Sequence, residues 1–130
     1  MAELIARPTR VPVPGGKLID EYVGRASSGD TEVSVAHMIA PGGWAEPAQT
    51  PDFDEFTVVL RGCVRVETAT GVVDVTAGGA IVTRAGERVR YSAPLVEGAE
   101  YVAVCRPAFA PDLAGREDAD EDGHPHAETA

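Results

Sequence analysis

One stretch of this 130-residue chain decides its fold: residues 41–62, which read PGGWAEPAQTPDFDEFTVVLRG. Its first part is rich in glycine and proline, and that composition predicts a loop. From Glu55 onward the stretch becomes an apolar run with Val58, Val59 and Leu60, which predicts a β-strand. Gly62 ends the stretch seven residues after Glu55. The stretch therefore predicts a long loop that leads into a strand with a carboxylate near its start.

The rest of the body repeats this alternation of short apolar runs and turn residues. The runs are rich in Val, Ile, Thr and Tyr, and Gly, Pro and Asp separate them at intervals of about 8–12 residues. No segment has a sustained apolar period of 3.6 residues, so helices should be few and short. Strands of this number and spacing predict an all-β sandwich or barrel. The predicted strands cover residues 18–23, 32–39, 56–60, 63–68, 72–75, 80–83, 89–92 and 100–105.

The composition is that of one acidic globular domain. A hydrophobic fraction of 44% is too high for a disordered chain, and the length suits a single domain. The formal charge of −10 argues against nucleic acids and anionic membranes as partners. No apolar run is long enough to span a bilayer, and the first ten residues lack a signal-peptide core. We therefore expect a cytoplasmic protein in which Cys63 and Cys105 are reduced thiols.

The negative charge is concentrated near the C-terminus. Residues 112–130 contain seven acids and a single base, Arg116, and apolar periodicity ends before them. We therefore predict three parts: an extended N-terminal segment over residues 1–16, a barrel over residues 17–114, and an acidic disordered tail over residues 115–130.

The spacing of Glu55 and Gly62 resembles the end of the first sequence motif of the cupin superfamily. Gly78 and Gly86 fit the two glycines of its second motif, and the resemblance covers roughly residues 17–107. It implies a cupin-type double-stranded β-helix, also called a jelly-roll barrel. It also implies a homodimer, because small cupins commonly pair through their N-terminal strands. The proline-rich residues 6–16 could cross onto a partner.

The metal-binding histidines of typical cupins are missing from the matching positions. The first pair falls on Ala48 and Thr50 or on Gln49 and Pro51, and the third position is Val89. Only the carboxylate, Glu55, is retained, and one carboxylate cannot hold a divalent metal. The chain thus resembles a histidine-poor subgroup of small cupins, for which we expect no cofactor.

Strand alternation selects the side chains that could line the barrel. The family orientation of Glu55 points it inward, and the position of Val89 brings Tyr91 inward with it. As catalytic candidates we take Glu55, Glu46 and His37. As substrate-binding candidates we take Trp44 as an apolar wall, Gln49, Tyr91, and Arg90, which could bind a substrate carboxylate at the rim even though alternation turns it outward.

Two carboxylates in an apolar cavity predict acid–base chemistry. Desolvation and mutual repulsion would raise the pKa of one of them, so that Glu55 and Glu46 could act as acid and base while His37 shuttles the proton. This favours a lyase, isomerase or cyclase that acts on a small carbonyl-type substrate, such as one of specialised metabolism.

Other interpretations of the same residues stay open. Glu46 could be a solvated loop acid, Glu55 could bind loop amides, and His37 could be a satisfied core residue. The protein could be a non-catalytic module that binds a small ligand, or an interaction protein that uses the barrel as a scaffold. A divalent metal such as Mn²⁺ or Zn²⁺ could also be recruited by His37, Glu46, Gln49 and Glu55.

Overall fold

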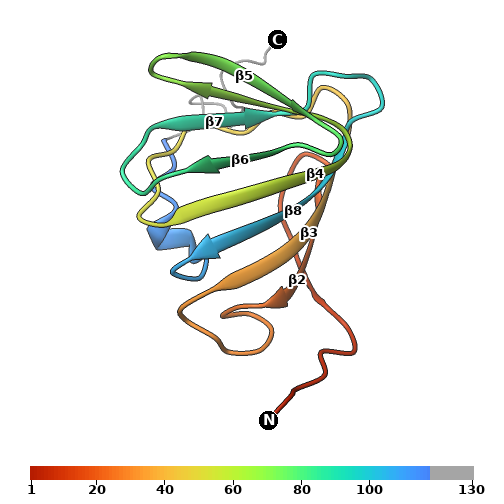
Figure 1. The fold of residues 1–130 in the computed structure, drawn as a ribbon, viewed down its shortest axis with the longest axis vertical. Coiled ribbons are helices and arrows are strands. Elements are labelled where there is room, and N and C mark those ends of the chain that lie inside the picture. The colour runs from red at the N-terminus through yellow and green to blue at the C-terminus, as the bar shows by residue number, and fades with distance from the viewer. Residues whose placement is uncertain (118–130) are drawn as a thin grey trace.

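The computed structural model describes residues 1–117, which form two facing antiparallel sheets (Figure 1). The predicted all-β fold is confirmed, since the only helical element of these residues is one short 3-10 turn, η1 (Pro111–Leu113). No helix in residues 1–117 is long and apolar enough to cross a membrane. The strands are β1 (Thr9–Val11), β2 (Leu18–Val23), β3 (Ser34–Ala40), β4 (Asp54–Thr68), β5 (Gly71–Thr76), β6 (Ala80–Thr83), β7 (Val89–Ser92) and β8 (Ala99–Arg106).

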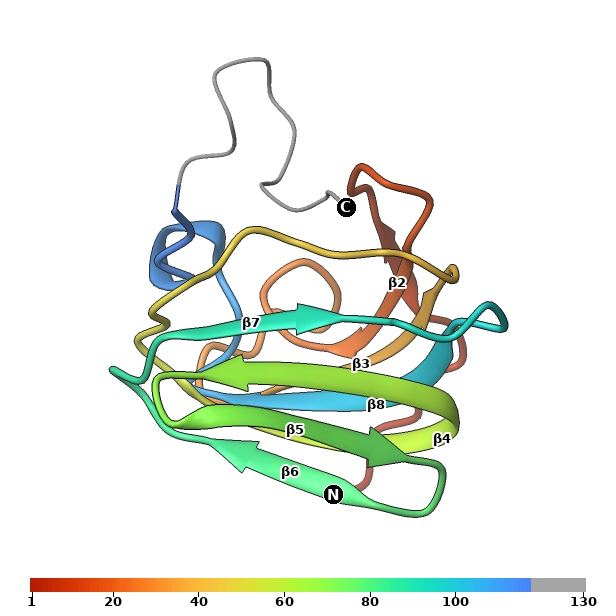
Figure 2. The ribbon, with the colours of Figure 1, turned by 90° about the horizontal axis from the view of Figure 1, so that it is seen from above.

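Strand β4 belongs to both sheets and closes the barrel. Its first half pairs with β6 and β8 in the sheet that continues through β3 and β2 to β1. Its second half pairs with β5 and β7 in the other sheet. The runs predicted at residues 56–60 and 63–68 are thus one strand of 15 residues. Figure 2 shows β4 curving from one sheet into the other.

The change of sheet depends on Gly62. Its φ is 77°, a conformation that L residues with a side chain rarely adopt. A Cβ at this position would lie 2.0 Å from the carbonyl oxygen of Gly98. The glycine seven residues after Glu55 is therefore required by the close approach of two backbone segments.

Apolar side chains from both sheets pack between them at one end of the barrel. On β8 every second residue points inward, as the alternating burial of Ala99, Tyr101, Ala103 and Cys105 shows. Val59 and Val66 of β4 are fully buried against them. Towards the other end the inward residues of β3 and β8 are small, among them Ser34, Ala36 and Ala103, and they leave the space that the cavity occupies.

The division into segment, barrel and tail stays a prediction, but the chain directly after residue 114 packs on the barrel. Residues 115–117 are held to the loop before β4: Gly115 accepts a hydrogen bond from the amide of Thr50 at 2.9 Å, and the amide of Glu117 donates to Ala48 at 2.8 Å. The rest of the predicted tail, residues 118–130, lies outside the described residues. The N-terminal segment contains β1, which pairs with β2 of the same chain.

Candidate functional site

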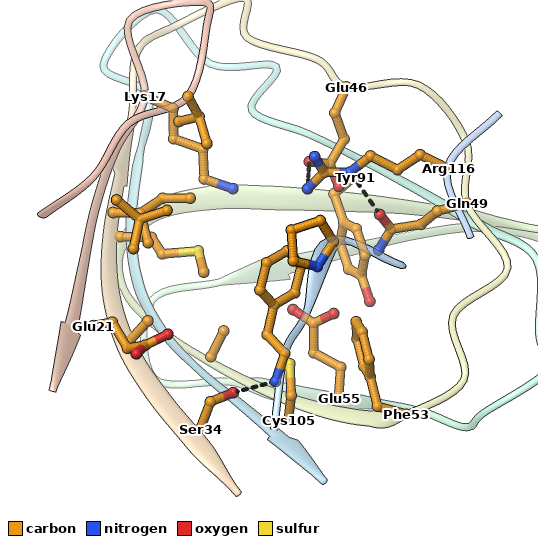
Figure 3. Close-up of a pocket in the computed structure, with 18 of the residues that line it drawn as sticks. Lys17, Glu21, Ser34, Glu46, Gln49, Phe53, Glu55, Tyr91, Cys105 and Arg116 are labelled. Atoms are coloured by element: carbon orange, nitrogen blue, oxygen red, sulfur yellow. Dashed lines mark hydrogen bonds and ion pairs between the residues drawn. The ribbon is translucent and has the colours of Figure 1, made fainter. Parts of the chain in front are cut away.

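A cavity of about 190 Å³ opens at the end of the barrel where the inward side chains are small (Figure 3). Its walls come from the N-terminal segment with β2, the strands β3, β7 and β8, the loop before β4 with the start of β4, and the segment after β8. Most of the lining is apolar or aromatic, with a few convergent polar groups, which is the usual form of a small-molecule site. The charged side chains that line the cavity are Lys17, Glu21, Glu46, Glu55 and Arg116.

Glu55 lies on the inward face of β4, and its carboxyl group points into the cavity (Figure 3). Burial raises its pKa to about 7, and repulsion from Glu46 contributes in the same direction. Lys17, a hydrogen bond from Tyr91 and Arg116 partly offset this rise. At neutral pH both the acid and the carboxylate of Glu55 are therefore populated, which a group that donates and accepts protons requires.

The Tyr91 hydroxyl is held next to this carboxyl group by β6 and β7. It lies 2.9 Å from Oγ1 of Thr83, and the side chain is 5% exposed. Burial and the charge of Glu55 raise the pKa of the Tyr91 phenol far above its ordinary value. Tyr91 is therefore a neutral hydrogen-bonding group throughout the physiological pH range.

Glu46, Gln49 and Arg116 form a polar cluster on the loop side of the cavity. Nε of Arg116 donates to Oε1 of Gln49 at 3.3 Å, and Nη2 of Arg116 lies 4.0 Å from Oε1 of Glu46. Gln49 is fixed by two backbone hydrogen bonds of 2.8 Å to Val89, which dock the loop onto β7. The Arg116 side chain remains 42% exposed and so lies at the rim.

Lys17 enters the cavity from just before β2, and its ammonium group points towards the centre (Figure 3). Nζ lies 4.1 Å from the ring centroid of Trp44 and 5.3 Å from that of Tyr101. Burial lowers the pKa of Lys17, while Glu46 and Glu55 counteract that effect. Lys17 and the carboxylates thus share one enclosed site.

The structure brings together four of the predicted site residues: Glu55, Glu46, Gln49 and Tyr91 all line the cavity. Two further residues, Lys17 and Arg116, were missed by sequence reasoning. Lys17 is the single lysine in a chain with ten arginines, and Arg116 is the single base among the acids of residues 112–130. These two departures from the surrounding composition are the features of the sequence that could have identified Lys17 and Arg116.

The prediction that His37 lines the cavity is wrong. Its face of β3 points outward, because Ser34, Ala36 and Met38 take the cavity side of the strand. His37 Nε2 lies 2.7 Å from Oε2 of Glu100 on the neighbouring strand β8. The structure therefore places His37 outside the cavity, away from the side chains that line it.

Two substrate-binding predictions are also corrected. Arg90 does not line the cavity: it donates to the backbone oxygen of Glu46 at 3.1 Å and to Oε2 of Glu67 at 3.0 Å, and so braces the loop from outside. Trp44 belongs to the apolar core, where it is 8% exposed and lies beneath Lys17 rather than against the cavity.

The residues present do not fit the metal that typical cupins hold. The positions of the missing histidines carry groups that are poor ligands, and Gln49 and Val89 pair with each other through their backbones. Within residues 1–117 no three His, Cys, Asp or Glu side chains gather at one point. The alternative set of His37, Glu46, Gln49 and Glu55 is not assembled either, because His37 lies on the outer face.

Glu21 lines the cavity as a structural group. Its Oε2 accepts hydrogen bonds of 2.9 Å from the amides of Ala26 and Ser27 and from the Ser27 hydroxyl. These bonds hold the β2–β3 connection closed. Cys105 also lines the cavity, and burial raises the pKa of its thiol well above the ordinary value, so this thiol stays protonated.

A barrel of two facing antiparallel sheets that share a long strand has the jelly-roll architecture, and comparison with solved structures identifies the fold. A variant of oxalate decarboxylase from Bacillus subtilis matches with a TM-score of 0.73 at 18% identity, over 88% of this chain and 32% of that one. KdgF from Halomonas sp. matches with a TM-score of 0.65 at 14% identity, over 78% of this chain and 89% of that one. The chain thus has the cupin fold that its motifs implied.

Sequence comparison finds one relative, whose name differs from those of the structures with the same fold. Over 107 residues, 82% of this chain, the sequence is 40% identical to the endoribonuclease YbeY of Myxococcus xanthus. The chain spans only 36% of that protein's length. No protein-family model matches the sequence.

Proposed function

We propose that this protein is a small-molecule enzyme of the cupin fold, in which Glu55 acts as general acid and base on a small carbonyl-type substrate. The observation that carries the proposal is a carboxyl group inside an apolar cavity with a pKa of about 7. Such a group suits lyase, isomerase or cyclase reactions, which move a proton next to a carbonyl group. We also assign the chain to the histidine-poor cupins, with no metal in the reaction.

The neighbouring side chains have distinct roles in this proposal. Glu46 keeps the pKa of Glu55 high by repulsion and is itself held near Arg116. Tyr91 donates a hydrogen bond to the reacting oxygen or to Glu55, because its hydroxyl stays neutral. Gln49 and Arg116 bind the polar end of the substrate at the rim.

An RNA substrate is a weaker candidate, although the Myxococcus relative is named an endoribonuclease. Its name describes a protein of which this chain spans about a third. The formal charge of −10 repels a phosphate backbone, and the acids of the cavity would do the same.

The proposal is tested by proton exchange. The protein is incubated in D₂O with a panel of small 2-oxo- and 3-hydroxy-carboxylates, and C–H signals next to the carbonyl or hydroxyl carbon are followed by ¹H NMR. We expect exchange or conversion of at least one compound. Glu55→Gln should slow it by about 100-fold or more, since acid–base groups contribute factors of that order.

The matched control is Glu100→Gln, which removes a carboxylate from the outer face of β8. Its rate should equal that of the unmodified protein. An unchanged rate in Glu55→Gln would contradict the proposal. A compound that raises the melting temperature without any exchange would instead support a non-catalytic binding module.

A further inference from the structure

The single lysine of the chain lies inside the cavity. The other ten basic residues are arginines, so arginine is the ordinary cation of this sequence. A guanidinium group cannot lose its proton in a protein, whereas an amine can. The exception to the arginine preference is therefore found at a partly buried position on the cavity wall, where a neutral nitrogen would be chemically useful.

Lys17 presents its amine to the cavity from a partly desolvated position. Its Nζ faces the cavity and is packed against the aromatic rings of Trp44 and Tyr101. Burial lowers the pKa of Lys17, which makes the neutral amine more accessible than it is for an exposed lysine. Glu55, a group able to donate and accept protons, points into the same cavity (Figure 3).

The rim supplies a recognition group for an anion. Arg116 uses Nε for Gln49, and its Nη2 lies 4.0 Å from Glu46, so donors remain on its half-exposed guanidinium group. The charge of Arg116 is among those that act on Lys17, so both cations face one compartment.

We propose that Lys17 forms an imine with the carbonyl carbon of a small 2-oxo-carboxylate, whose carboxylate group is bound by Arg116. This inference deepens the proposed function and rests on it for the proton donor, Glu55. It names the substrate class and adds a covalent step in the same cavity.

The step balances with the groups present. The lone pair of neutral Nζ forms the N–C bond, and the π pair of the carbonyl goes to oxygen, which takes a proton from Glu55. The Glu55 carboxylate then removes a proton from nitrogen and returns it to the carbinolamine hydroxyl. That oxygen leaves as water while the nitrogen lone pair forms the C=N bond, so the products are a protonated imine, a Glu55 carboxylate and water.

The test is reductive trapping with glyoxylate or pyruvate and sodium cyanoborohydride at neutral pH, followed by peptide mass spectrometry. Because the chain has one lysine, only Lys17 and the N-terminal amine can be labelled. Arg7→Lys adds an exposed reference lysine in the same molecule. We expect Lys17 to be labelled at least about tenfold faster than Lys introduced by Arg7→Lys, because the latter is almost fully protonated at this pH.

Four outcomes distinguish the possibilities. Faster labelling of Lys17 that is lost in denaturant, and weakened by Arg116→Gln, supports the proposal. Labelling of Lys17 at or below the rate of the reference lysine overturns it, and this comparison needs no variant of Lys17 that folds. Proton exchange without a Lys17 adduct would refute the imine and leave the proposed function standing. A Lys17 adduct without proton exchange would support the imine and contradict the proposed function.

Discussion

At the scale of single residues, the main feature of the cavity is that ionisable side chains are desolvated there. Glu55 is the clearest case, because burial and Glu46 raise its pKa while Lys17 and Arg116 lower it. Burying a carboxyl group costs stability unless it takes up a proton or finds a partner. The folded chain tolerates this loss of stability at Glu55. The raised pKa leaves Glu55 able to donate and accept protons near neutral pH.

The raised pKa of Glu55 predicts a specific dependence of stability on pH. The ordinary value is 4.5 and the folded value about 7, so the folded chain holds the proton more tightly than the unfolded one. The stabilisation is complete below pH 4.5 and is lost as pH rises through 7. From pH 5 to pH 8 the unmodified protein should lose roughly 2–3 kcal/mol relative to Glu55→Gln.

Urea unfolding of both proteins at the two pH values measures this difference. Carboxylates such as Asp20, Asp54 and Asp74, whose pKa values are lowered by ion pairs or hydrogen bonds, have the opposite pH dependence. They are present in both proteins and cancel in the comparison. Parallel pH profiles for the two proteins would show that Glu55 titrates normally.

Sequence reasoning found Glu55 but misplaced His37, and the difference has a physical cause. Alternation shows which residues of a strand share a face, but not which face is buried. The face of Val35, His37 and Ile39 is aliphatic, yet the cavity side of β3 carries the smaller Ser34 and Ala36. Small inward residues make room for a cavity, and a hydrophobicity pattern does not detect them.

At the scale of elements, the loop before β4 and the segment after η1 together form the polar side of the site. Gln49 pairs with Val89 of β7 and bridges to Arg116, so three distant segments meet there. Composition alone predicted that residues 115–117 belong to a tail, because their tertiary contacts leave no local signal. The strands themselves were predictable from local composition and turn residues.

Gly115 lets the last of these segments approach the loop. Its φ is 62°, and a Cβ there would lie 2.2 Å from the carbonyl oxygen of Thr50. Gly115→Ala should therefore cost about 1–3 kcal/mol of stability and displace Arg116 from the rim. Chemical denaturation measures the first effect, and loss of carboxylate binding the second.

Gly86→Ala is the matched control for this prediction. Gly86 has a similar φ of 87°, but a Cβ there would meet no atom within 4 Å. Gly86→Ala should therefore lose only the stability that a positive φ costs a residue with a side chain, and it should leave the site intact. Equal destabilisation by the two substitutions would contradict a steric role for Gly115.

At the scale of the whole molecule, the cupin fold provides a barrel, and the inward-facing side chains of this sequence determine what lines its cavity. The cupin motif predicted the architecture because Gly62 and the curved β4 are structural necessities. It did not predict the chemistry, since the metal-ligand positions have other side chains and the charges of Lys17 and Arg116 enter from the two ends of the chain. The homodimer stays a prediction; β1, the segment expected to cross over, pairs with its own β2.

Titration of the Glu55 carboxyl carbon shows whether this group exchanges protons near neutral pH. ¹³C NMR of protein labelled at the glutamate side chains follows each carboxyl group, and the signal absent from Glu55→Gln identifies this residue. We expect a midpoint at about pH 7 for the Glu55 carboxyl group. A midpoint near the ordinary value of 4.5 would contradict it.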